Sequence, residues 1–211
     1  MSSICRKHPI AVVVVALLAL PALWLDVTPK AAAQAPPTAS LTGQLLVASP
    51  TMGDPRFART VILMVRHDKD GAFGIVVNRL VGERPLATLL ETLGEKDTAA
   101  TGQVRIFAGG PVQPDIGFVV HSTDYHQPTT VDVNARVAMT SSREILRDIG
   151  NDKGPQKSLI AFGYAGWAPG QLEGELARRD WVVTPGESKL IFDEDRDTVW
   201  DAAFAQRTLD L

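Results

Sequence analysis

The sequence predicts an α+β protein built around a mixed β-sheet. Short β-branched and apolar runs, which are typical of strands, recur along the whole chain, and hairpin signals such as Asp70-Gly71 join them. Only a few stretches have apolar residues at helical spacing. These helices do not alternate regularly with the strands, which argues against a doubly wound α/β fold.

The N-terminus differs in composition from the rest of the 211 residues. Basic residues at 6–7 precede the apolar run 10–25, and small residues follow, which is the pattern of a secretory signal peptide. The run contains Pro21 and is shorter than the roughly 20 residues that a bilayer span needs. We therefore expect residues 1–33 to be a signal peptide or N-terminal anchor, 34–40 a linker and 41–211 the folded domain. The alternative is a cytoplasmic protein.

The first half of the domain is predicted to be mainly strand. We expect strands at 42–50, 60–68 and 74–78, with a polar loop at 51–59 that has turn chemistry at Asp54-Pro55. Because 60–68 is apolar almost throughout, that strand should be buried on both faces.

The clearest helix is predicted over 84–94. Pro85 suits its first turn, and Gly94 suits its end. The face that it would bury carries Leu86, Leu89, Leu90 and Leu93. Strand-like runs follow at 103–112, 115–122 and 130–139. A second helix, capped by Ser141 or Ser142, is expected at 141–151, then a strand at 157–166, a helix at 170–180 and a strand-like run at 181–186.

The stretch "GYAGWAPGQLEGEL", residues 163–176, is the first candidate site. Its glycine spacing is neither the dinucleotide fingerprint nor a P-loop, and the carboxylates that follow would repel phosphate. We favour a tight corner that packs Trp167 on the core and pairs Gln171, Glu175 and Arg179 at i,i+4 spacing. The alternative is a polar small-molecule pocket floored by Trp167 and edged by Gln171 and Glu175.

Gly109 and Gly110, which follow a predicted strand, form a second candidate together with Gly163. Glycine permits positive φ or close backbone approach, so the favoured interpretation is a strand-to-strand corner. The alternative is a nest of N–H groups for an anionic ligand, although Pro111 cannot donate. The loop at 51–59 is either a surface loop or the rim of a pocket, where arginine could pair with a carboxylate or phosphate.

Metal and catalytic signals are weak. His121, Asp124 and His126 are the best metal-ligand candidates, but their spacing matches no established zinc pattern. We therefore predict no metal and no cofactor, and interpret His121 as a hydrogen-bonded structural histidine. No G-x-S-x-G elbow is present, and Cys5 is the only cysteine, so we assign no catalytic residue. A hydrolase that uses His121 and neighbouring carboxylates remains an alternative.

The charge pattern disfavours nucleic acid as a partner. The formal net charge is -3, and the basic residues are scattered, whereas binding to nucleic acid needs a basic stripe. The partner is expected to be an unknown small molecule or protein. Contact with a membrane is expected only through residues 1–33, if that segment is not cleaved.

Several motifs occur in a characteristic order. They are "GQLLVASPTMGDPRFARTVI", "HDKDGAFGIVVNR", "GGPVQPDIGFVVHS", "AFGYAGWAPGQLEGEL" and "LIFD" followed by Trp200. In this order and spacing, the chain from about Leu41 to Trp200 resembles the AlgH/YqgE family of small bacterial proteins. The resemblance implies a bifurcated, barrel-like sheet surrounded by helices. It also implies a transcriptional-regulator label, given to one member in alginate production, but no catalytic residue set. The chain departs from the family in its export-like extension and in its C-terminal "AQRTLDL", which lacks the expected glycine-containing ending.

The expected function is a non-enzymatic module that binds a ligand or partner, exported or anchored by its N-terminus. A pocket that joins Trp167, Asn78 and His121 would support ligand binding. A transcriptional regulator is the alternative implied by the resemblance, although an exported protein does not meet DNA. The candidate ligand-binding residues are Asn78, Gly109, Gly110, His121, Gly163, Trp167, Gln171 and Glu175.

Overall fold

The computed structural model describes residues 39–95, 100–193 and 195–207. All of these residues belong to one compact unit of the chain. The expected signal peptide or anchor at 1–33 and most of the expected linker at 34–40 lie outside the described residues. Within the described ranges, no helix is long and apolar enough to cross a membrane.

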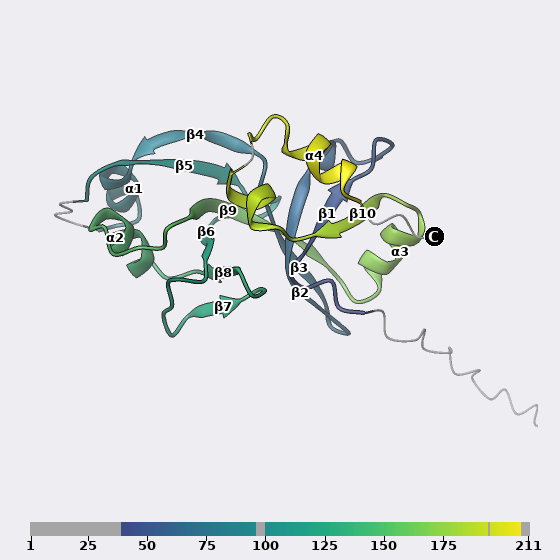
Figure 1. Cartoon of the computed structure of the whole chain (residues 1–211), viewed down its shortest axis with the longest axis horizontal. Coiled ribbons are helices and arrows are strands. Elements are labelled where there is room, and N and C mark those ends of the chain that lie inside the picture. The colour runs from purple at the N-terminus through teal and green to yellow at the C-terminus, as the bar shows by residue number, and fades with distance from the viewer. Residues whose placement is uncertain (1–38, 96–99, 194, 208–211) are drawn as a thin grey trace, which may run out of the picture. The chain divides into compact units, whose positions relative to one another are not determined.

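In this part of the chain ten strands form one sheet, in the order β10-β1-β2-β3-β9-β6-β8-β7, and a β4–β5 ribbon joins it at β9 (Figure 1). Strands β5 and β9 pair in parallel, and the other pairs are antiparallel. The strands are β1 (Gln44–Ala48), β2 (Val61–Asp68), β3 (Gly71–Val76), β4 (Leu80–Pro85), β5 (Gln103–Ala108), β6 (Val112–Ser122), β7 (Thr130–Asp132), β8 (Val137–Thr140), β9 (Ser158–Trp167) and β10 (Trp181–Pro185).

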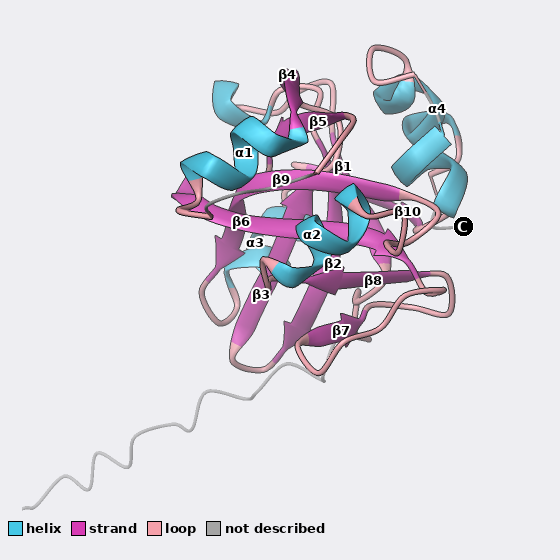
Figure 2. Ribbon diagram, turned by 90° about the vertical axis from the view of Figure 1, so that its left-hand side faces the viewer, coloured by secondary structure: helices cyan, strands magenta, loops and turns pink. Residues whose placement is uncertain are grey.

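Short helices pack on this sheet. Figure 2 shows α1 and α2 in front of β9 and β6, and α3 on the far side of the sheet in that view. The predicted α+β class with a mixed sheet is therefore confirmed. The helices are α1 (Leu86–Thr92), α2 (Glu144–Gly150), α3 (Gln171–Ala177) and α4 (Val199–Ala205), with a 3-10 turn η1 (Pro55–Phe57) and a π-helical turn η2 (Lys189–Asp193).

The sheet branches at β9, which confirms the bifurcated sheet. Residues 160–162 of β9 pair with β5, and residues 165–167 pair with β3, while β6 pairs along the opposite edge. Gly163 lies between the part of β9 that pairs with β5 and the part that pairs with β3, and it has φ +76°. Ala161 and Tyr164 both contact the same core cluster, so the side-chain alternation of β9 reverses at Gly163.

Three apolar clusters fill the structure. One lies on the face covered by η2 and α4, a second lies beneath α3, and a third lies beneath α1 and α2. In β2, Leu63 and Val65 belong to the first cluster, whereas Ile62 and Met64 belong to the second. This confirms that β2 is buried on both faces. Leu86, Leu89 and Leu90 are buried on α1, as their spacing predicted.

Several element boundaries differ from expectation. Strand β4 was not predicted, because it is almost wholly exposed and lacks a buried apolar face. Strand β3 begins at Gly71, since the hairpin after β2 is tighter than expected. Helix α2 begins at Glu144, and its N-terminus has no side-chain cap. The Ser142 hydroxyl bonds instead to the side chains of Gln127 and Glu144.

Candidate functional site

The "GYAGWAPG" stretch continues β9 and then turns into α3. Strand β9 runs to Trp167, so Gly163 and Gly166 lie within the strand, and the turn itself covers residues 168–170. Gly170 has φ +76°, in the left-handed region that favours glycine. The Gln171 side chain secures the turn, because its Oε1 accepts from the Ala168 N–H at 3.1 Å. The favoured interpretation as a corner describes this segment, although the turn lies after Gly166.

Glu175 on α3 connects the two strands that flank the helix. The indole Nε1–H groups of Trp167 and Trp181 both donate to Glu175 Oε2, each at 2.8 Å. Gln171 Nε2 donates to Glu175 Oε1 at 3.0 Å, which is the expected i,i+4 contact. Arg179 does not extend this row, because α3 ends at Ala177 and Arg179 has φ +62°. Glu175 therefore holds the end of β9 and the start of β10 together.

These residues form one side of a cavity of about 510 Å³, here called the tryptophan cavity. Three segments far apart in the sequence meet there: the loop before β2, the β5–β6 connection, and the stretch from the end of β9 to the start of β10. Phe57 packs edge-on against Trp181, with ring centroids 5.5 Å apart. The lining residues are Met52, Gly53, Asp54, Arg56, Phe57, Pro111, Val112, Gly166, Trp167, Gln171, Glu175, Arg178, Asp180 and Trp181.

The charged groups at the cavity mouth are mostly paired with each other. Arg56 Nη2 lies 2.7 Å from Asp54 Oδ2, and Arg178 Nη2 lies 2.9 Å from Asp180 Oδ2. The hydrogen bonds from Arg56 hold the pKa of the Asp54 carboxyl below its ordinary value. The loop at 51–59 thus forms the rim of a pocket in the structure. Both of its arginines are engaged by aspartates, Arg56 by Asp54 and Arg59 by Asp201.

Gly109, Gly110 and Gly163 form a close crossing of backbone. A Cβ atom on Gly109 would lie 2.3 Å from the Gly163 oxygen, and one on Gly110 would lie 2.0 Å from the Tyr164 carbonyl carbon. The Gly109 N–H donates to Phe162 O at 2.7 Å, so it is not available to an anion. The corner interpretation fits this geometry, and the anion nest does not.

His121 lies inside the sheet, away from the tryptophan cavity. Its exposed fraction is 0%, its Nδ1 is 2.9 Å from Ser122 O, and its Nε2 is 2.9 Å from Thr140 Oγ1. Since a carbonyl oxygen can only accept, Nδ1 carries the proton and Nε2 accepts from the Thr140 hydroxyl. Burial lowers the pKa of His121, which favours this neutral form. These contacts are those of a hydrogen-bonded structural histidine.

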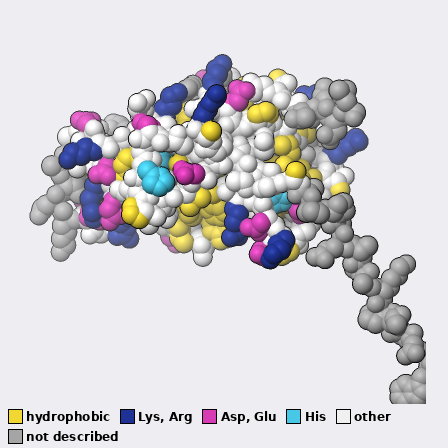
Figure 3. Space-filling model, turned by 60° about the horizontal axis from the view of Figure 1, so that its bottom comes forward, with side chains coloured by type: hydrophobic (Ala, Val, Ile, Leu, Met, Phe, Trp, Pro, Cys, Tyr) yellow, Lys and Arg dark blue, Asp and Glu magenta, His cyan; other side chains and the backbone are white. Residues whose placement is uncertain are grey.

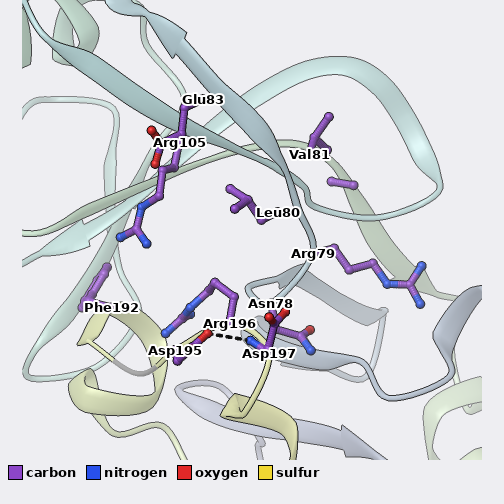
Figure 4. A pocket seen from close by; sticks show the side chains of 11 residues that line it. Asn78, Arg79, Leu80, Val81, Glu83, Arg105, Phe192, Asp195, Arg196 and Asp197 are labelled. Carbon is purple, nitrogen blue, oxygen red and sulfur yellow. Dashed lines mark hydrogen bonds between the residues drawn. The ribbon is translucent and has the colours of Figure 1, made fainter.

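Asn78 lines a second cavity, of about 790 Å³, here called the β4 cavity. Its side chain bridges backbone groups, because Oδ1 accepts from Val61 N and Nδ2 donates to Arg59 O, each at 2.9 Å. Figure 4 shows Leu80 in the middle of this cavity and the Arg79 guanidinium turned away from it. The lining residues are Asn78, Arg79, Leu80, Val81, Glu83, Arg105, Ala108, Phe192, Asp195, Arg196 and Asp197. The structure therefore does not join Asn78 and His121 to Trp167 in one pocket.

The metal-ligand candidates do not converge. No group of three His, Cys, Asp or Glu side chains suited to a metal ion occurs in the described ranges. His67, a further histidine, accepts from Leu41 N at 3.1 Å and lies 2.9 Å from Glu173 Oε1. His126 Nδ1 lies 3.8 Å from Asp132 Oδ1. The two contacts of His67 tie β2 to the start of the domain and to α3.

Comparison with known proteins identifies the family of this chain. The model of the AlgH-like family matches residues 45–211. The chain belongs to the AlgH-like family. A UPF0301 protein of Sphingopyxis alaskensis is 47% identical over 169 residues, which cover 80% of this chain and 90% of that protein. A UPF0301 protein of Methylococcus capsulatus is 42% identical, covering 82% of this chain and 94% of that protein.

Two solved structures share the fold of this chain. The solution structure of the AlgH protein from Pseudomonas aeruginosa has a TM-score of 0.69 and 39% identity, and the match covers 80% of this chain and 89% of that one. A crystal structure from Corynebacterium diphtheriae has a TM-score of 0.60 at 22% identity, with 80% and 87% covered, which supports the fold alone. The AlgH-like family is thus established, and the UPF0301 names state no activity.

Sequence reasoning missed one principal member of the tryptophan cavity. The sequence pattern identifies Trp181 only as the first residue of a strand, although its side chain contacts Glu175, Phe57 and Trp167. The signal that could have found Trp181 is its position directly after the predicted helix. A short helix between two strands brings the end of the first strand close to the start of the second.

Proposed function

We propose that this AlgH-like protein is a non-enzymatic module that binds a small ligand in the tryptophan cavity. One observation carries the proposal: three segments far apart in the chain converge on a cavity with three aromatic rings and a hydrogen-bonded carboxylate. Its volume of about 510 Å³ lies within the roughly 300–1,000 Å³ that is typical of small-molecule sites. An aromatic lining with a few fixed polar groups is the usual composition of such a site.

Binding is a better fit than catalysis because the reactive side chains are already engaged. A general base must accept a proton from its substrate, yet both ring nitrogens of the buried His121 have protein partners. The Ser122 hydroxyl bonds to the Asp124 carboxylate, and the Ser49 hydroxyl lies 3.1 Å from Thr51 Oγ1. These contacts give little support to the hydrolase alternative.

The transcriptional-regulator alternative has weaker support than ligand binding. On the face shown in Figure 3, Lys and Arg side chains lie among Asp and Glu side chains. The formal net charge of -3 also opposes binding to a polyanion. We retain export as part of the proposal, on the signal-like pattern of residues 1–33. The intact mass of the native protein in soluble and membrane fractions tests it, and a full-length cytoplasmic species would contradict it.

A cavity-filling variant tests the proposed function. A Cβ atom on Gly53, which lines the cavity, would have no neighbour within 4 Å, so a bulky side chain there meets no initial clash. Compounds from a fragment library should show saturation-transfer NMR signals with the wild-type chain and lose them with Gly53→Trp. Thr88→Trp, on the exposed side of α1, is the matched control and should retain them. Binding that is equally strong in all three chains would place the ligand elsewhere.

A further inference from the structure

The tryptophan cavity carries one uncompensated negative charge. Its lining includes the three carboxylates of Asp54, Glu175 and Asp180 but only the two guanidinium groups of Arg56 and Arg178. Each arginine already pairs with the aspartate two residues away. The carboxylate left without a cationic partner is that of Glu175.

The hydrogen bonds to Glu175 hold it in place without neutralising it. All three described donors, the two indole N–H groups and the Gln171 amide, are uncharged. Among the described residues no Lys, Arg or His nitrogen forms an ion pair with this carboxylate. Charges that are withdrawn from water are usually paired, and Glu175 is partly buried. An incoming cation would supply the missing partner.

The remaining cavity wall also favours a cation. Phe57, Trp167 and Trp181 all line the cavity, and aromatic rings attract ammonium and guanidinium groups. The Arg56 guanidinium already lies over the Phe57 ring, 5.9 Å from its centroid. Glu175 Oε1 accepts one described hydrogen bond, from Gln171, whereas Oε2 accepts two. A carboxylate oxygen has two lone pairs, so Oε1 retains capacity for a charged donor from a ligand.

We propose that the ligand of the tryptophan cavity is a small organic monocation, with a primary ammonium or guanidinium group on a short alkyl chain. The cationic group donates to Glu175 Oε1, and the alkyl chain lies against the aromatic rings. This inference rests on the proposed ligand-binding function and specifies the ligand class of that site. The same chemistry occurs in free amines and in the basic side chains of polypeptides.

The indole N–H signals of the full-length chain give a direct readout. Protonated butylamine and butylguanidine are the probes, and butanol and butyrate are neutral and anionic controls with the same total of four carbons as butylamine. The two cations should shift the Trp167 and Trp181 signals, whose N–H groups bond to Glu175, and leave Trp200 unchanged, because its Nε1–H donates to Ala48 O. Trp→Phe variants assign the signals. Nα-acetyl-lysine methylamide, a capped lysine, tests whether the natural ligand is a side chain of a polypeptide. If it is, the capped lysine should bind about tenfold more tightly than butylamine.

Two substitutions test the charge dependence. Glu175→Gln keeps an acceptor but removes the charge, so it should weaken butylamine binding by about tenfold. Arg56→Gln removes a cation from the cavity lining and leaves the Asp54 carboxylate without its partner, so it should strengthen that binding severalfold. It leaves the indole contacts in place. Tighter binding of butyrate than of butylamine, or weaker butylamine binding in Arg56→Gln, would overturn the cation assignment.

The same experiments distinguish a wrong ligand class from a wrong ligand-binding site. If butylamine and butylguanidine leave both indole signals unchanged while neutral or anionic fragments still lose binding in Gly53→Trp, the cation assignment is wrong and the ligand-binding function stands. If no compound depends on Gly53, both are wrong.

Discussion

The carbonyl oxygen of Gly110 lies 2.4 Å from the position that a Cβ atom on Gly163 would occupy. This close approach occurs where β9 exchanges β5 for β3 as its partner, so the branch in the sheet depends on the absence of a side chain at residue 163. Pro111 and Val112, which follow Gly110, and Gly166, which follows Gly163, line the tryptophan cavity. The sheet's branch point therefore positions one wall of the site.

We expect Gly163→Ala to destabilise the protein by about 3 kcal/mol. Positive φ costs a residue with a Cβ atom roughly 1–2 kcal/mol, and the overlap with Gly110 adds about as much again. Gly170→Ala is a matched control, because Gly170 has the same φ of +76° but no neighbour within 4 Å of an added Cβ atom. It should cost only about 1 kcal/mol. Urea unfolding measures both, and equal costs would contradict the role of the close approach.

Glu175→Leu should destabilise the protein by about 2–4 kcal/mol. It leaves two donors without their acceptor, in indoles that are only 7% (Trp167) and 3% (Trp181) exposed, and each unsatisfied buried donor costs about 1–3 kcal/mol. Glu91→Leu, on the exposed side of α1, is the control and should stay within about 0.5 kcal/mol of wild type. A loss no larger than that of the control would mean that these hydrogen bonds do not stabilise the β9–α3–β10 segment.

The order of most elements was predictable from local patterns, whereas the convergence that forms the cavity was not. Apolar spacing identified α1, and the continuous run at 60–68 identified β2, because both signals lie within one element. The i,i+4 contact of Gln171 with Glu175 was predictable for the same reason. The contacts of Trp181 and Phe57 depend on how distant segments pack. Strand β4 gave no signal, since its pairing with β5 is stabilised by backbone hydrogen bonds and not by a buried face.

The stability of the protein should fall as the pH drops below about 6.5, the ordinary pKa of histidine. Burial lowers the pKa of His121 in the folded state, so in the window below 6.5 the unfolded chain binds the proton more readily than the folded chain does. His121→Gln should reduce this dependence, because it removes the titrating group. Urea unfolding between pH 5 and pH 8 measures the effect. Parallel curves for the two chains would show that His121 does not contribute.

Arg196→Met should cost about 3 kcal/mol. Arg196 is 8% exposed, and its guanidinium donates to the carbonyl oxygens of Val77, Ile191 and Leu190, which fastens the η2–α4 connection to the end of β3. Removing it leaves buried acceptors unsatisfied. Arg105→Met, at an exposed position that lines the same β4 cavity, should change stability by less than about 0.5 kcal/mol. Thermal unfolding followed by circular dichroism compares the two, and similar melting temperatures would contradict the role given to Arg196.

The central claim is that the tryptophan cavity is the ligand site. The most direct measurement is an isotope-edited NOE experiment between the tightest ligand from the screen and the side-chain protons of the full-length chain. We predict NOEs from the ligand to the rings of Phe57, Trp167 and Trp181. NOEs to Leu80, Val81 and Phe192 instead would place the ligand in the β4 cavity and contradict the claim.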